Sequence, residues 1–210
     1  MENGEKFVEK WSVNGDDLFE NGIYEIATDM IHKFSRVGEI GCGTGHSTLA
    51  LLLGNHKVFA VDIFPECITE SENRIQDIGY EETTAITWSD EDATLMRANL
   101  FDPLFVNSIV NFDFDIILMW NPGQMDRVKL VDQCAIIANC KGVSLQVIER
   151  GVSYEEGLEL LMEIASDNRM CLREYKIIPV EWNHQEGIRM EGTDNKTIYM
   201  AIGLFEPYSS

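Results

Sequence analysis

The residues best suited to chemistry lie in a glycine-rich segment and in two acidic residues beside it. Residues 39–46 read EIGCGTGH, and Asp62 follows seventeen residues after Gly45. Three glycines at alternate positions lack Cβ atoms, so the backbone there can approach a flat or charged ligand and adopt positive φ. An acidic residue at the end of the second strand of an open α/β sheet can hold a ribose by its hydroxyls. Together these features predict a site for a nucleoside cofactor.

The glycine spacing and Glu39 indicate which class of cofactor would fit. Dinucleotide-binding loops favour G-x-G-x-x-G, in which a helix N-terminus faces a pyrophosphate. Here the spacing is G-x-G-x-G, and Glu39 precedes the first glycine by two residues. A carboxylate at that place repels a pyrophosphate, and it suits a ligand that carries a positive amino or sulfonium group. The pattern therefore favours such a ligand over a dinucleotide.

The stretches EIGCGTGHSTLAL (39–51) and VFAVDIFPE (58–66) resemble motifs I and II of the class I S-adenosylmethionine (SAM) methyltransferases. The resemblance covers roughly residues 37–123, and the rest of the chain follows only the general plan of that family. It implies SAM as the cofactor and a set of binding residues spread over four strand ends. These are Glu39, Gly41, Cys42, Gly43, Gly45, Asp62, Ile63, Asn99 and Asn121.

The third strand can be placed in two ways. It spans either 85–88 or 94–98, and we prefer the second because ANLFDPL (98–104) resembles the turn after that strand in many amino-group methyltransferases. The resemblance then implies that Asn99 stands where an Asp usually accepts a hydrogen bond from the adenine amino group. An Asn oxygen can accept the same bond. In the alternative register Asp92 takes this role.

A second candidate for chemistry follows the apolar strand expected at 114–120. The turn Trp120-Asn121-Pro122-Gly123 resembles the Asn-Pro-Pro-aromatic motif of methyltransferases that modify exocyclic or amide nitrogens. In those enzymes the Asn oxygen and the first Pro carbonyl accept hydrogen bonds from the target amino group, which makes Asn121 the one catalytic candidate. Gly123 and Gln124 depart from the motif. Asn121 and Pro122 either orient an acceptor or only shape the turn. Trp120 either replaces the missing aromatic ring of the motif or lies in the core.

Strands and helices alternate along the chain, which requires parallel pairing with right-handed crossovers. Helices are expected at 17–34, through 49–53 to a stop at Gly54, from Pro65 to a cap at Gly79, at 125–138, and from a capping box of Ser153 and Glu156. Strands are expected at 37–40, 57–61, 94–98, 114–120, 143–148, 172–180 and 196–205. The last two strands have no helix between them and should pair as an antiparallel hairpin at one sheet edge. The predicted fold is α/β: a Rossmann-like, seven-stranded, mostly parallel sheet with a C-terminal antiparallel hairpin and helices on both faces. Residues 1–210 form one domain, with an N-terminal helical segment over about 1–35.

Charge and composition exclude several classes of partner. The net charge is −20, from 36 acidic and 16 basic residues, and such a field repels nucleic-acid phosphates. No apolar run approaches the ~20 residues of a membrane span, and the N-terminus lacks the order of a signal peptide. The five cysteines include no C-x-x-C pair, which indicates reduced thiols, a cytoplasmic location and no metal site. We interpret Cys42 as a packing residue.

We therefore expect a SAM-dependent methyltransferase that acts on a nitrogen or oxygen nucleophile of a small molecule or a protein. One alternative is a SAM- or nucleoside-binding partner subunit without catalysis. An NAD-dependent oxidoreductase is less favoured, because the dinucleotide glycine spacing and a Tyr-x-x-x-Lys pair are absent. Acceptor-side candidates are Tyr24, Trp11, Gln124 and the segment 181–195. The sequence does not predict the acceptor or the oligomeric state.

Overall fold

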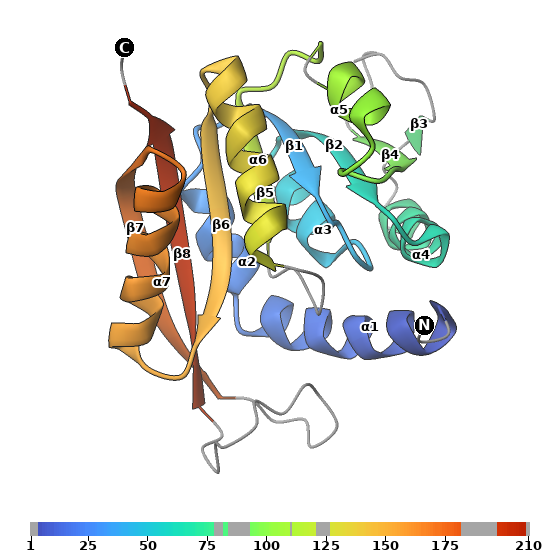
Figure 1. The fold of residues 1–210 in the computed structure, drawn as a ribbon. Helices are drawn as coiled ribbons and strands as arrows, with labels where there is room; N and C mark the ends of the chain where they lie inside the picture. The colour runs from blue at the N-terminus through green and yellow to red at the C-terminus, as the bar shows by residue number, and fades with distance from the viewer. Residues whose placement is uncertain are drawn as a thin grey trace.

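The computed structural model describes residues 4–77, 82–83, 93–109, 111–120, 127–181 and 197–208. They form one sheet with helices on both faces (Figure 1). The strands are β1 (Arg36–Ile40), β2 (Lys57–Asp62), β3 (Glu82–Thr83), β4 (Ala93–Arg97), β5 (Ile116–Trp120), β6 (Ser144–Gly151), β7 (Met170–Glu181) and β8 (Thr197–Pro207). The helices are α1 (Gly4–Glu20), α2 (Ile23–Asp29), α3 (His46–Leu53), α4 (Pro65–Gln76), α5 (Pro103–Ile109), α6 (Arg127–Lys141) and α7 (Tyr154–Asp167).

The strand order is β3-β4-β2-β1-β5-β6-β8-β7. All pairs from β3 to β6 are parallel, and β8 runs antiparallel to both β6 and β7. The predicted fold class is therefore confirmed, with the two-residue strand β3 added beyond the seven expected strands. The hairpin occupies the predicted edge, with β8 on its inner side.

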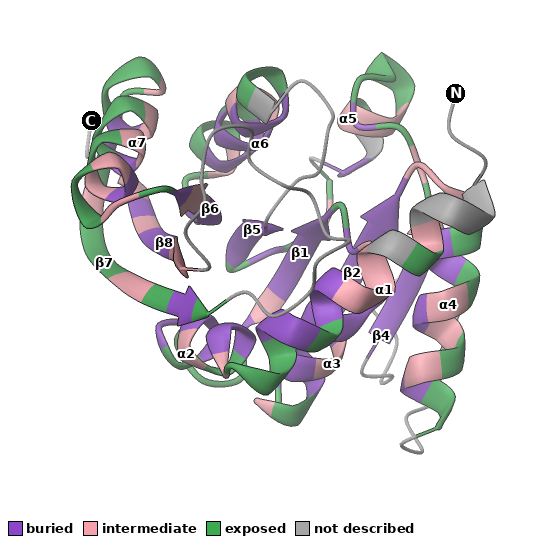
Figure 2. Cartoon of the chain, turned by 90° about the horizontal axis from the view of Figure 1, so that it is seen from below, coloured by how far each residue is buried: buried purple, intermediate pink, exposed green. Residues whose placement is uncertain are grey.

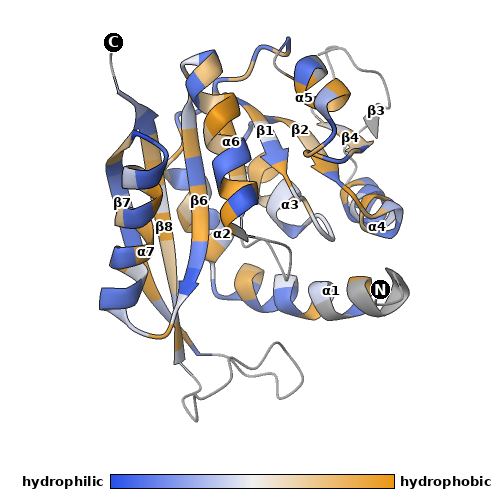
Figure 3. Ribbon diagram, in the orientation of Figure 1, coloured by the Kyte–Doolittle hydropathy of each residue, from blue (hydrophilic) through white to orange (hydrophobic). Residues whose placement is uncertain are grey.

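The central strands are buried on both faces, as their continuous apolar sequences predict. Every residue of β5 is buried, as are the last five of the six residues in β2. One core cluster lies between the sheet and α2, α3 and α4, and a second lies between the sheet and α5, α6 and α7 (Figure 2). Figure 3 shows apolar and polar residues alternating along α6 and α7. The sheet is thus clamped between two helical layers.

The N-terminal helix differs from the prediction. A single helix over 17–34 was expected from the spacing of its apolar residues, but the chain forms two helices that break at Asn21 and Gly22. Gly22 adopts a left-handed conformation with φ 69°, which ends α1 and turns the chain into α2. Apolar periodicity continues across the break because both helices bury one face against the same core, so the period alone did not reveal it.

The other boundaries follow the predictions closely. Strand β4 confirms the preferred register of the third parallel strand. The side chain of Ser153 accepts a hydrogen bond from the Glu156 amide at 3.1 Å, which is the predicted N-cap of α7. Pro65 begins α4 as expected, and α4 ends at Gln76. Gly79, the alternative strand 85–88 and Asp92 lie outside the described residues.

Helix α1 crosses the edge of the sheet at which the parallel strands end. It lies beyond the tips of β1 and β2 in Figure 1, and it lies in front of them when the molecule is seen from below in Figure 2. It contacts α2, α3 and α4. Among the described helices, none combines the length and apolar character needed to cross a bilayer.

Candidate cofactor site at the carboxyl ends of the parallel strands

The loop between β1 and α3 is held in a shape that only glycine adopts easily. Gly41, Gly43 and Gly45 have φ values of 77°, 55° and 83°. A Cβ at Gly41 or Gly43 would meet no atom within 4 Å, whereas one at Gly45 would lie 2.7 Å from Ser71 Cα. The first two glycines therefore leave open space for a ligand against the backbone. The third allows α4 to pack closely on the loop.

The backbone amides of the glycine loop donate hydrogen bonds to acceptors within the protein. The amides of Gly41 and Cys42 donate to the Val61 carbonyl at 2.8 and 3.0 Å. The Gly43 amide donates to Asp62 Oδ2 at 3.0 Å. A pyrophosphate-binding loop instead points its amides at the ligand. These three donors are already satisfied, so the loop is not arranged to hold a pyrophosphate.

Asp62 ends β2 directly beneath this loop. Its Oδ1 accepts from the Phe64 amide at 2.9 Å, while its Oδ2 accepts from Gly43. Burial raises the pKa of Asp62, and these amide donors oppose the shift. The residue is 8% exposed. The amides of Phe64, Gly43 and Ile63 all act on this carboxylate, whose two oxygens have four lone pairs in all, so it keeps capacity for one further donor, such as a ribose hydroxyl.

Glu39 lies deeper than its expected role suggested. It is 1% exposed, and its oxygens accept from the hydroxyls of Ser47 and Thr48, the latter at 2.6 Å. Burial raises the pKa of Glu39 to about 7, and the two hydroxyl donors oppose the shift. The carboxylate therefore ties β1 to α3 beneath the glycine loop. Because Glu39 is buried, it offers a ligand no exposed oxygen, and any effect on a ligand would come from its charge.

Two further predicted residues lie beside Asp62. The Ala98 amide donates to the Asp62 carbonyl at 2.9 Å, which brings the start of the turn after β4 next to the end of β2. Asn99 is exposed in that turn, and its Oδ1 accepts from the Phe101 amide at 2.9 Å. Ile63 is half-buried between β2 and α4. Asn99 thus lies in the turn after β4 with one side-chain lone pair already used by its own turn, and its contact with adenine stays a prediction.

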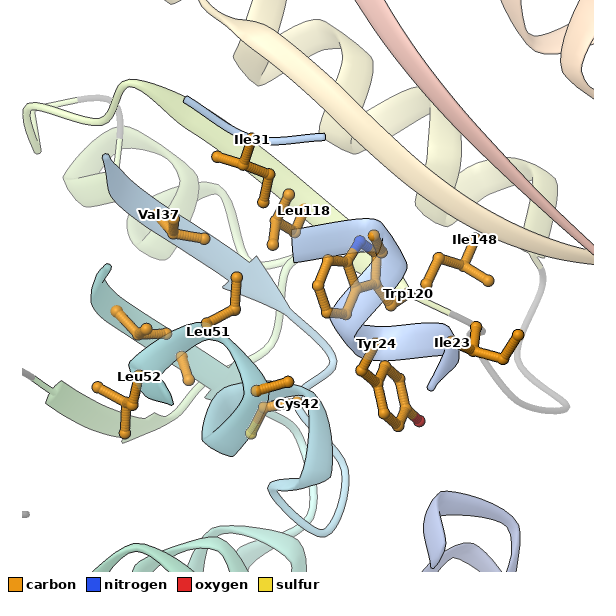
Figure 4. Packing of buried hydrophobic residues seen from close by; sticks show 14 of the residues in the cluster. Ile23, Tyr24, Ile31, Val37, Cys42, Leu51, Leu52, Leu118, Trp120 and Ile148 are labelled. Carbon is orange, nitrogen blue, oxygen red and sulfur yellow. The ribbon is translucent and has the colours of Figure 1, made fainter. Parts of the chain in front are cut away.

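Cys42 and Trp120 are both core residues. Cys42 is buried, and burial raises the pKa of its thiol well above the usual range, which agrees with its interpretation as a packing residue. Trp120 is 5% exposed and stacks on Tyr24 with ring centroids 5.8 Å apart (Figure 4). Its Nε1 donates to Gln146 Oε1 at 3.1 Å. Trp120 therefore does not replace the missing aromatic residue of the turn.

The turn that follows β5 is not described. Asn121, Pro122, Gly123 and Gln124 all lie outside the described residues, as does most of the acceptor-side segment 181–195. Tyr24 is buried beneath Trp120, and burial raises its pKa. In the described part of the chain, no group of three or more His, Cys, Asp or Glu side chains is arranged to hold a metal ion.

Sequence reasoning missed a polar cluster between α1 and the glycine loop. His46 Nε2 lies 2.6 Å from Asp16 Oδ1, and His46 Nδ1 lies 3.1 Å from Thr44 Oγ1. Arg74 Nε donates to the Thr44 carbonyl at 2.9 Å. No sequence signal links Asp16 to His46, because they are thirty residues apart on separate helices. A groove of about 480 Å³ runs beside this cluster between α1 and α4, lined by Val8, Glu9, Ser12, Val13, Glu66 and Glu70.

Three solved structures illustrate the likeness of the fold. A SAM-dependent methyltransferase from Methanosarcina mazei is 15% identical with a TM-score of 0.57, covering 87% of this chain and 96% of its own. Magnesium protoporphyrin IX methyltransferase from Synechocystis, solved with bound SAM, is 12% identical with a TM-score of 0.56, covering 99% and 85%. Precorrin 8w decarboxylase from Methanobacterium thermoautotrophicum is 20% identical with a TM-score of 0.56, covering 88% and 89%. At sequence identities this low, the likeness shows a shared fold and nothing more.

The sequence itself matches one family. No curated protein matches the chain. The family model described as a methyltransferase domain matches residues 38–115, which run from β1 through the glycine loop and Asp62 to the start of β5. Over residues 38–115 the chain therefore resembles a methyltransferase domain, and the solved SAM-dependent methyltransferases share its fold.

Proposed function

We propose that this protein binds SAM and transfers its methyl group to a nitrogen or oxygen nucleophile of a small molecule or a protein. The observation that carries this proposal is the glycine loop. Gly41 and Gly43 leave open space while their amides are bound within the protein, and Asp62 lies directly beside them. This arrangement suits a ligand with a ribose and a positively charged amino-acid tail better than it suits a pyrophosphate.

Methyl transfer from SAM requires few catalytic side chains. SAM supplies a methyl group that is already activated by the sulfonium, so in-line positioning and exclusion of water provide most of the acceleration. In this chain Asp62 would hold the ribose and Asn99 the adenine. The buried carboxylate of Glu39 would favour the positive end of the cofactor. Helix α1 lies over the same edge of the sheet, where it would limit access of water.

The acceptor would lie beside the end of β5. Trp120, the last residue of β5, stacks on Tyr24 there. We propose that Asn121, the next residue, contacts the cofactor pocket and orients an acceptor nitrogen. The net charge of −20 argues against a nucleic-acid acceptor. All five cysteines are unpaired in the structure, which supports a cytoplasmic location for the proposed reaction.

A second candidate is a SAM-binding partner subunit that does not catalyse methyl transfer. The departure of Gly123 and Gln124 from the Asn-Pro-Pro-aromatic pattern favours it. An NAD-dependent oxidoreductase is less favoured, because the loop amides are not directed at a pyrophosphate.

The decisive assay follows S-adenosylhomocysteine formation from SAM with panels of small amines, hydroxyl compounds and proteins, and includes Asp62→Ala as the inactive control. Acceptor-dependent formation by the native protein, lost in the variant, is the expected result. Tight SAM binding without turnover on any acceptor would instead support the partner-subunit function. Failure to bind SAM would overturn both.

A further inference from the structure

Helix α1 contacts the proposed cofactor site through one buried histidine. His46 is the first residue of α3, directly after the glycine loop, and only 4% of it is exposed. Its Nε2 lies 2.6 Å from Asp16 Oδ1 of α1, and its Nδ1 lies 3.1 Å from Thr44 Oγ1 of the loop. The imidazole thus bridges α1 and the glycine loop through its two ring nitrogens.

The backbone of α1 also lies directly on this ring. A Cβ at Gly15 would overlap the His46 imidazole, so the helix reaches this position only because residue 15 has no side chain. Gly15 lies inside a helix of 17 residues, where glycine costs about 1 kcal/mol relative to alanine. A residue unfavourable to the helix is therefore found where the backbone of α1 lies against the His46 ring.

Arg74 of α4 joins the same network. Its Nε donates to the Thr44 carbonyl at 2.9 Å, and its Nη2 lies 3.5 Å from Ser12 Oγ of α1. Its Nη1 also lies 3.9 Å from Asp16 Oδ1. The carbonyl and the hydroxyl of Thr44, which lies between Gly43 and Gly45, are therefore both bound by groups that hold α1.

We propose that His46 and Asp16 are positioning residues, which couple the docking of α1 to the shape of the glycine loop, so that SAM binds tightly only when α1 is docked. This inference rests on the proposed function for the identity of the ligand. Coupling between two sites is reciprocal. Bound cofactor must therefore stabilise the docked position of α1 by the same factor by which docking strengthens cofactor binding.

The first test uses variants that separate the two contacts of His46. His46→Gln keeps a side-chain amide that can donate to Asp16, whereas His46→Ala loses both contacts. Asp16 is 54% exposed, so Asp16→Asn should fold normally. The control is Glu20→Gln, which removes an exposed carboxylate from the same helix.

We expect the dissociation constant for SAM, measured by calorimetry, to rise about tenfold in His46→Ala and Asp16→Asn, because each loses a charge-assisted hydrogen bond. His46→Gln should recover most of the affinity, and Glu20→Gln should match the native protein. The double variant His46→Ala/Asp16→Asn should be no worse than His46→Ala alone, since His46→Ala already removes the contact with Asp16. Additive losses would contradict the coupling.

The second test measures hydrogen exchange without any cofactor, so its result does not depend on the ligand. In His46→Ala the amides of α1 should exchange faster, while those of β1, β2 and β5 should be unchanged. Gly15→Ala should behave in the same way, although alanine strengthens an isolated helix. Unchanged or slower exchange of the α1 amides in Gly15→Ala would show that the contact between Gly15 and His46 does not hold α1 in place.

The two tests separate the two proposals. If the native protein does not bind SAM but His46→Ala releases α1, then the docking contact is real and the proposed function is wrong. If SAM binds with unchanged affinity in His46→Ala, and α1 exchanges as in the native protein, then the positioning role is wrong and the proposed function stands.

Discussion

The carboxylate of Asp62 accepts a hydrogen bond from the Gly43 amide at 3.0 Å. This bond joins the end of β2 to the middle glycine of the loop after β1. The residue proposed to hold the ribose therefore also sets the shape of the backbone against which the rest of the cofactor would lie. Changes at Asp62 and at the glycines should affect cofactor affinity together.

Replacing Asp62 by Ala should cost about 2–4 kcal/mol of SAM affinity, the scale of charge-assisted hydrogen bonds. Asp62→Asn is the matched control, because it keeps the shape and one acceptor oxygen and should lose less. Calorimetric titration with S-adenosylhomocysteine measures both. Unchanged cofactor affinity in a folded Asp62→Ala protein would show that the ribose does not bind at Asp62.

Substitution of the three loop glycines by alanine should have two different kinds of effect. Alanine at Gly41 or Gly43 has free space, so it should cost stability only through its positive φ, about 1–2 kcal/mol, while cofactor binding is lost. Alanine at Gly45 meets Ser71 and should destabilise the fold further. Urea unfolding and SAM titration of the three variants distinguish these effects. Unchanged SAM affinity in the Gly41 and Gly43 variants would show that no ligand approaches the loop at these positions.

Glu39 should make stability depend on pH. Its pKa rises from about 4.3 in an unfolded chain to about 7 in the folded protein, because burial disfavours the charged form. The folded state therefore holds the proton more tightly. Its contribution to stability is fully present below about pH 4 and is lost as the pH rises through about 7, by roughly 3 kcal/mol.

Urea unfolding of the native protein and of Glu39→Gln across this pH range checks the prediction. The difference in the free energy of unfolding between the two should change through this window, whereas the exposed-carboxylate control Glu20→Gln should follow the native protein. A flat difference would show that Glu39 titrates normally despite its burial.

Asn121 is expected to act in the transition state. If it orients an acceptor nitrogen, then Asn121→Ala should lower kcat while SAM affinity stays nearly intact. If Asn121 only shapes the turn, stability, binding and turnover should fall together. A co-crystal structure offers an independent measurement. A distance of more than about 8 Å from Asn121 to the sulfonium would exceed direct or single-water hydrogen-bonding reach and exclude a contact of Asn121 with the cofactor pocket or the acceptor.

Much of the fold could be predicted because the parallel strands are short apolar runs separated by clear turn signals. The glycine loop and Asp62 were predictable for the same reason, since strand ends fix their place in the sheet. The break at Gly22 was missed because apolar periodicity continues across it. The burial of Glu39 under two hydroxyls and the contact of Asp16 with His46 depend on long-range packing, which no local pattern reveals.

The most direct test of the account is calorimetric titration of the native protein with SAM and, separately, with NAD. The account predicts that SAM binds far more tightly, because the loop amides are bound within the protein and the buried Glu39 disfavours a pyrophosphate. Tighter binding of NAD than of SAM would contradict it.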